Sequence, residues 1–265
     1  MSNKNTIIVN DYNNSDLLKV QKLGFTSYTA AERKYEPQTQ NTFSFQFLFD
    51  KGQVAYIGTA ANMQKSSIAG ADEIDAFNYN NGLRQINDIL NTSMQGLTSP
   101  TKNIGAIMID FFNSQIKYAG KPTYNNANIT LNTLIGLGSK NVLAAWSDIC
   151  LNERTLEGGW SRSLKSIVEG PLPQKDANED DETYLNRLFP LIGYKCDGIL
   201  LECARDGSIV NQWDYIGMWI SSFTPGSFNM AGANTPSQIT ATITVDKIQQ
   251  ATTKTVLSKV NNYQL

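Results

Sequence analysis

The fold follows from residues 238–246, which read QITATITVD. Apolar and polar side chains alternate through this stretch, and a period of two places them on opposite faces of a β-strand. The apolar set is predicted to face the core, and it consists of Ile239, Ala241, Ile243 and Val245. The polar set is predicted to face a polar surface, and it consists of Gln238, Thr240, Thr242 and Thr244.

Further strands are predicted in pairs. Four phenylalanines, from Phe43 to Phe49, alternate with other residues and predict a strand with its rings on one face. The sequence Asp50-Lys51-Gly52 is typical of a turn, and it predicts a return strand at residues 54–57. Two more hairpins are expected, one joining 116–119 to 128–134 through Pro122 and one joining 198–204 to 209–215.

Helices are expected at two places. Apolar residues recur at helical spacing within 83–94 and within 141–152, where Trp146 shares a face with Val142 and Ile149 and is predicted to be a core residue. Residues 58–81 and 158–183 are interpreted as loops. The predicted fold class is therefore mainly β, an antiparallel sandwich or barrel with a flanking helix and extended loops.

We expect one domain over residues 1–265. It would comprise an N-terminal arm at 1–40, a β core at 41–246 with insertions at 58–100 and 158–190, and a C-terminal extension at 247–265. Hairpin strands of this kind carry more β edge than one chain can pair. Contacts between subunits are therefore expected at Phe43, Phe45, Gln46, Lys121, Pro122 and Tyr124.

The composition argues against most enzyme classes. The 265 residues include no histidine, which removes histidine general bases and most transition-metal enzyme sites. Cys150, Cys196 and Cys203 lack the spacing of zinc ligands and fit buried thiols. Charged residues make up only 17%, which suggests that other subunits cover part of the surface. We expect no catalytic residues, cofactor or metal, and neither a signal peptide nor a membrane span.

Two short motifs resemble ligand sites but depart from them. Residues 136–140 read GLGSK, yet Asn141 stands where a dinucleotide-binding loop needs its third glycine, so a strand-to-helix turn is favoured. Asp176, Asn178 and Asp180 resemble the start of a calcium loop. Asp181 replaces the required glycine, which favours a solvated acidic loop.

The order of elements over residues 104–246 resembles the tail tube protein of a contractile-tailed bacteriophage. The motif behind the resemblance is a glycine, a bulky residue and a proline-containing bend before the final amphipathic strand. Gly217, Trp219 and Pro225 occupy those places, and residues 238–246 form the strand.

The resemblance implies a structural virion protein. In that family, hexameric rings stack into a tube that conducts the genome, so this chain is expected to pair with itself and with sheath, tape measure, baseplate and terminator proteins. It would be assembled in the host cytoplasm and reside in the virion tail. The polar face of residues 238–244 would line the lumen, past which DNA slides without specific binding. The insertions leave the type of sheath open.

Two alternatives remain at this point. Another tail or baseplate component, or a secretion-system tube, would share the strand pattern. A histidine-free hydrolase or carbohydrate-binding β domain would differ by remaining monomeric and exposing an aromatic platform.

Overall fold

The computed structural model describes residues 43–64, 73–112, 114–133, 138–152, 157–204, 209–226 and 237–251. The expected arm at 1–40 and residues 252–265 of the expected extension lie outside these ranges. The chain divides into two compact units. The first comprises Met1–Gln46, Ile199–Asp214 and Gln249–Leu265, and the second comprises Phe47–Gly198 and Tyr215–Ile248.

The first predicted hairpin is wrong in its second half. Strand β1 (Phe43–Leu48) is followed by helix α4 (Lys51–Met63), so residues 54–57 are helical and the expected loop at 58–81 begins as helix. Asp50 is the N-cap, and a capping box joins it to Gln53 in both directions. The helix is buried along most of its length, so its apolar residues show neither a strand period nor a one-sided stripe.

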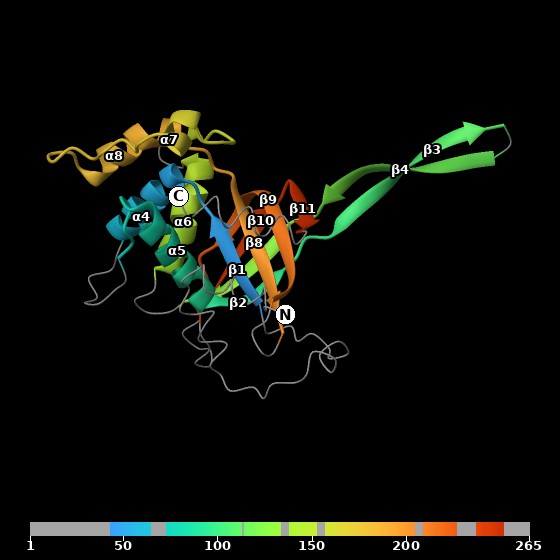
Figure 1. Cartoon of the computed structure of the whole chain (residues 1–265), viewed down its shortest axis with the longest axis horizontal. Helices are drawn as coiled ribbons and strands as arrows, with labels where there is room; N and C mark the ends of the chain where they lie inside the picture. Colours follow the sequence, from blue (N-terminus) through green and yellow to red (C-terminus); the bar gives the residue numbers. More distant parts are fainter. Residues whose placement is uncertain are drawn as a thin grey trace, which may run out of the picture. The chain divides into compact units, whose positions relative to one another are not determined.

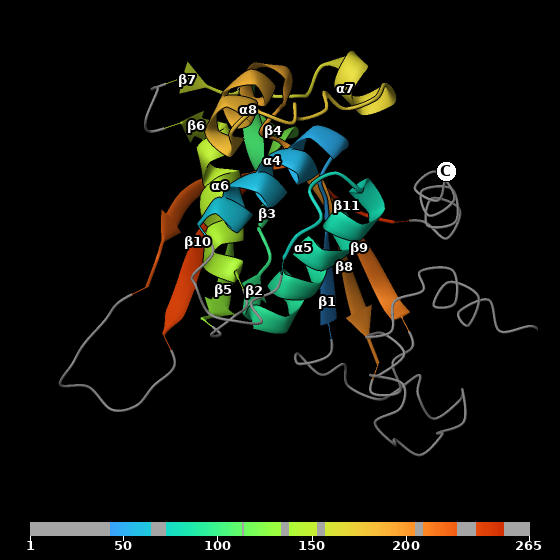
Figure 2. The same cartoon turned by 90° about the vertical axis from the view of Figure 1, so that its left-hand side faces the viewer.

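Three helices pack together in the second unit. Helices α5 (Tyr79–Ser93) and α6 (Ser139–Cys150) fulfil the two helix predictions, and each contacts α4. The three lie over one face of strands β5 and β10 of the same unit (Figure 1 and Figure 2). Their core centres on Trp146, whose indole meets the rings of Phe47 and Phe49 edge-on at 5.7 and 5.2 Å between centroids.

The strands beneath these helices pair antiparallel. Strand β10 (Gln238–Thr244) lies between β5 (Ala127–Asn132) and β9 (Ile209–Thr224), and β2 (Met94–Thr98) pairs with β5 on its far side. Ala241 stands opposite Ile129 on one side and Phe223 on the other. Ile239, Ile243 and the following Val245 are buried, Gln238 and Thr240 are exposed, and Thr242 and Thr244 are half-buried.

The whole sheet has the order β1-β8-β9-β10-β5-β2, with β8 spanning Cys196–Cys203 and β11 (Lys247–Gln250) paired to β9. The predicted mainly β, antiparallel class is confirmed, although no closed barrel is found within the described part of the chain. More helix is present than predicted. The additions are α4, α7 (Lys165–Glu169), α8 (Asp181–Leu188) and the 3-10 turn η1 (Phe189–Leu191).

The second predicted hairpin has a different partner. Strand β4 (Ser114–Tyr124) pairs with β3 (Lys102–Phe111), so the chain reverses between Phe111 and Ser114 instead of at Pro122. Pro122 lies within β4 opposite Ile104, beside a register shift, where its missing N–H is tolerated. A third, two-stranded sheet joins β6 (Leu151–Asn152) to β7 (Glu157–Gly158).

Candidate assembly surfaces

The β3–β4 hairpin is exposed on both of its faces. Every residue of β3 is solvent-exposed, and β4 is exposed except at two half-buried positions. The hairpin projects away from the helices and strands of its own unit (Figure 1). At about 3.3 Å per residue, its ten-residue strand β3 is roughly 33 Å long.

One face of this hairpin is apolar. Ile107 stands opposite Tyr118 and Ile109 opposite Ile116, and Phe111 continues the row along β3. These five side chains, which we call the apolar hairpin face, are each 39–56% exposed. A contiguous exposed apolar surface of this kind is typical of an interaction site.

The other face of the hairpin is mixed. Met108 stands opposite Lys117, and Asp110 stands opposite Gln115. One cation and one anion on this face make it suited to water, so the two sides of the hairpin differ in the surroundings they favour.

The tip of the hairpin carries two phenyl rings. Phe111 and Phe112 pack edge-on with centroids 4.9 Å apart, and Phe112 is 93% exposed. Phe112 also has a φ of 53°, a left-handed conformation that costs a bulky residue about 1–2 kcal/mol. The turn therefore holds an aromatic side chain in water at a cost in backbone strain.

A second surface is the outer side of the sheet in the second unit. The strand pairings place ten neutral polar side chains there, and we call them the polar sheet face: Thr98, Asn128, Thr130, Asn132, Ser222, Thr224, Gln238, Thr240, Thr242 and Thr244. Hydrogen bonds between strands tie this face together. Thr242 donates to Asn128 at 3.1 Å and Gln238 donates to Gln95 at 2.6 Å.

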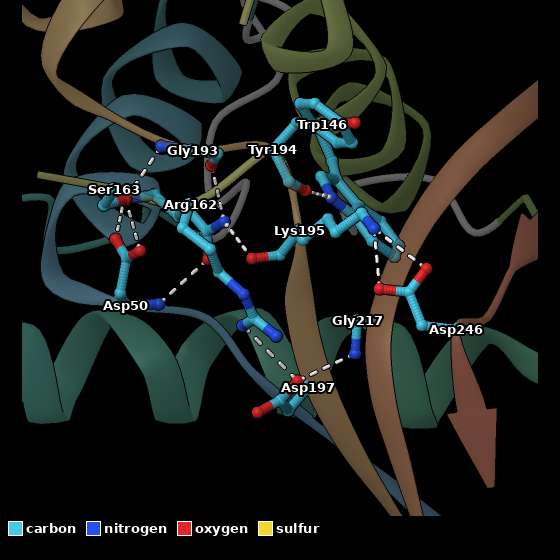
Figure 3. Close-up of polar contacts among 11 residues, drawn as sticks. Asp50, Trp146, Arg162, Ser163, Gly193, Tyr194, Lys195, Asp197, Gly217 and Asp246 are labelled. Atoms are coloured by element: carbon cyan, nitrogen blue, oxygen red, sulfur yellow. Dashed lines mark hydrogen bonds and ion pairs between the residues drawn. The ribbon is translucent and has the colours of Figure 1, made fainter. Parts of the chain in front are cut away.

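Ion pairs border this sheet at Gly217 (Figure 3). The Lys195 ammonium contacts the Asp246 carboxylate at 2.6 Å, and the Asp197 carboxylate accepts the Gly217 N–H at 2.9 Å while Arg162 lies 3.6 Å away. Gly217 has a φ of +68°, and a Cβ at this position would collide with Asp246. The glycine predicted from the sequence motif is thus required by both backbone and packing.

A buried polar cluster lies nearby (Figure 3). The Ser163 hydroxyl donates to Asp50 at 2.5 Å and accepts the Gly193 N–H at 2.8 Å, and the Gln53 amide donates to the Gly193 carbonyl at 2.6 Å. Burial raises the pKa of the Asp50 carboxyl, and the Ser163 hydrogen bond opposes that shift. The cluster fastens the chain near Gly193 to the start of α4.

The buried polar cluster and the cysteine thiols have the surroundings of structural groups and not of reactive ones. Burial raises the pKa of Cys150 to about 12 and raises the pKa of Cys196 well above its usual value, so both stay protonated near neutral pH and are poor nucleophiles. Within the described ranges, no group of three His, Cys, Asp or Glu side chains could hold a metal ion. No helix in those ranges is long and apolar enough to cross a membrane.

The residues predicted at subunit contacts fall into different environments. Phe45 and Gln46 are inside the protein at 1% and 8% exposure, and Phe43 is half-buried. Lys121 and Pro122 are exposed on β4, while the half-buried Tyr124 donates to the carbonyl of Ile248. Trp146 is fully buried, and its indole N–H donates to the Tyr194 carbonyl at 3.2 Å.

Sequence reasoning missed the apolar hairpin face. The signal was present, because Ile107, Ile109 and Phe111 alternate and two apolar residues recur at the same period after Asn113. Placing the turn at Asn113 would have brought these residues onto one side. Because proline is common in turns, Pro122 led to a predicted turn at the wrong position.

Neither a protein-family model nor a curated protein matches the chain. Solved structures that match the chain include a chain of the sheath–tube complex of an extracellular contractile injection system, PVC, in its extended state. That chain is 11% identical, with a TM-score of 0.42, and the match covers 85% of this chain and 99% of that one. A chain of the sheath/tube terminator of the same system is 11% identical, with a TM-score of 0.41 and coverage of 82% and 98%.

The tube-terminating cap of the anti-feeding prophage is also similar, at 14% identity and a TM-score of 0.36, covering 60% of this chain and 80% of that one.

Proposed function

We propose that this protein is the subunit of a phage tail tube, a structural virion protein that assembles as stacked hexameric rings and forms the conduit for genome ejection. The observation that carries the proposal is the apolar hairpin face. Five large apolar side chains stand in water on a projecting element, and the exposed tip ring of Phe112 adds to them. A second copy of the chain is the partner that would be present wherever this hairpin is exposed.

The hairpin suits head-to-tail joining. It is one surface that must meet a different surface on the next copy, and such heterologous contacts generate rings or open tubes. Six copies per ring is the number that the family resemblance implies. The low charge of the chain, 17%, fits a subunit with much of its surface covered by neighbours.

The polar sheet face is proposed as the wall of the lumen. Helices α4–α6 already cover the opposite side of these strands, which leaves the threonine, asparagine and glutamine side toward water. A basic wall would hold passing DNA through counterion release, and this face supplies no lysine or arginine. The protein alone should therefore give no gel shift with duplex DNA at physiological salt.

The remaining partners follow from the same role. Tail sheath, tape measure, baseplate and terminator proteins would contact the tube, which would be assembled in the host cytoplasm and reside in the virion tail. Contractile tails are the group whose pattern the sequence resembles. The proposed role needs no catalytic residue, cofactor or metal.

Negative-stain electron microscopy of the purified full chain over a concentration series tests the proposal. The expected result is stacked sixfold rings above a threshold concentration. A chain that stays monomeric at every concentration would overturn it. Isolated rings that never stack, or that only cap other tubes, would instead identify the alternative, another tail or baseplate component or a secretion-system tube component.

A further inference from the structure

The strand segments that carry the polar sheet face contain no Asp, Glu, Lys or Arg, and the acidic Asp214 of β9 lies outside this face and is buried. These segments are residues 94–98, 127–132, 215–224 and 238–244. Exposed strand faces in ordinary soluble proteins carry such residues for solubility. Four neighbouring strand segments without one make an unusually large uncharged surface.

Two ion pairs lie next to this face. At the Gly217 end, Lys195 binds Asp246 at 2.6 Å, and Arg162 lies 3.6 Å from Asp197 (Figure 3). Each cation has its own anion within 4 Å, so the fields of these groups largely cancel beyond a Debye length of about 8 Å at physiological salt. These two pairs therefore add no net charge beside the face at its Gly217 end.

The neutral polar side chains of this face also form hydrogen bonds with one another and with neighbouring polar residues. Thr242 donates to Asn128, Thr244 donates to Asn126 at 3.3 Å, and Gln238 donates to Gln95. Hydroxyls and amides that are bonded along the wall offer a weakly polar, hydrated surface. Channels select ions chiefly through rings of charged side chains or closely spaced carbonyl groups, and this surface supplies no charged ring.

We infer that the lumen of the assembled tube does not discriminate between cations and anions, so that passage depends on the size of a solute and not on the sign of its charge. The inference rests on the proposed function, because it takes the polar sheet face as the lumen wall. It goes further by assigning the wall a selectivity. In a ring, each residue of the wall repeats in every subunit, so a single added charge per chain would be multiplied around the bore.

The test is the reversal potential of purified tubes sealed end-on across a synthetic membrane under a KCl gradient. The wild-type tube should have a permeability ratio of potassium to chloride within about twofold of one. Thr242→Glu should make the tube cation-selective, and Thr242→Lys should make it anion-selective. Lys165→Gln, which alters an exposed charge on α7 away from this face, should leave the ratio unchanged.

The outcomes separate the two proposals. A chain that forms no tubes overturns the proposed function and the inference with it. Wild-type tubes that conduct with a strong preference for one sign overturn the inference alone. If the Thr242 variants fail to assemble, the potassium-to-chloride permeability ratio of the wild-type tubes still tests the inference. If they assemble and leave the ratio unchanged, the polar sheet face does not line the bore.

Discussion

Replacing one apolar side chain of the apolar hairpin face with a charged one should raise the protein concentration needed for assembly. We choose Ile109→Lys, because Ile109 is 52% exposed and stands in the middle of the face, opposite Ile116. Burying a whole large apolar side chain stabilises by about 1.5–3 kcal/mol, so covering the exposed half of Ile109 contributes about 1 kcal/mol. Placing an ammonium in an apolar contact costs about 2 kcal/mol more.

The sum of about 3 kcal/mol corresponds to a roughly hundredfold higher critical concentration. The assay is sedimentation of tubes across a dilution series, with electron microscopy of the pellets. The matched control is Met108→Lys, which adds the same charge one residue away on the opposite face, at 57% exposure and beside Lys117. It should shift the critical concentration by no more than about threefold, and neither variant should change monomer stability by more than about 0.5 kcal/mol.

Equal effects of the two variants, or a larger effect of Met108→Lys, would refute the assignment of the apolar side as the contact. Unfolding of the Ile109→Lys monomer would refute the premise that this side chain belongs to the surface. Urea titration of both monomers below the assembly threshold provides that measurement.

Three further substitutions test the interior. Trp146→Ala removes a fully buried indole and its edge contacts with two phenylalanines, and it should lower the free energy of unfolding by roughly 3–5 kcal/mol in urea titrations, with Trp146→Phe costing less. Gly217→Ala should cost more than the 1–2 kcal/mol or so of its left-handed backbone, because the new Cβ meets Asp246; adding Asp246→Ala should recover the excess, and additive costs would contradict the clash. The folded-state pKa of Asp50 is raised, so its contribution to stability is complete below the unfolded value of about 3.9 and is lost as pH rises through the folded value. Wild type should therefore lose stability relative to Asp50→Asn as unfolding is followed upward from pH 4, and a constant difference would contradict the raised pKa.

Sequence periodicity predicted the strands and helices that have one buried side. Residues 238–244 alternate without a fault because α4–α6 cover only one face of that strand, and α5 shows its stripe for the same reason. The same reasoning failed for residues 53–61, because α4 is buried along most of its length. An apolar run of that kind is compatible with a strand or a helix. The reciprocal spacing of Asp50 and Gln53 was the local signal that favours a helix.

The candidate surfaces were predictable only in part. One strand of the polar sheet face was evident, because its polar residues alternate within seven positions. Its extension over β2, β5 and β9 depends on pairings between segments far apart in the chain, which periodicity does not reveal. The apolar hairpin face required a choice between turns at residue 113 and at Pro122, and local propensity favoured the proline.

The projecting hairpin also gives the proposed tube a direction of growth. If each subunit offers a hairpin to one neighbour and a receiving surface to the other, one end of the tube displays apolar β-strands and the other displays vacant acceptors. Two unlike ends add subunits at different rates, so elongation would proceed mainly from one of them. The same strands are an aggregation hazard on a free subunit. A template that starts polymerisation early would shorten the time for which a free subunit exposes these strands, and a cap would meet a different surface at each end of the tube.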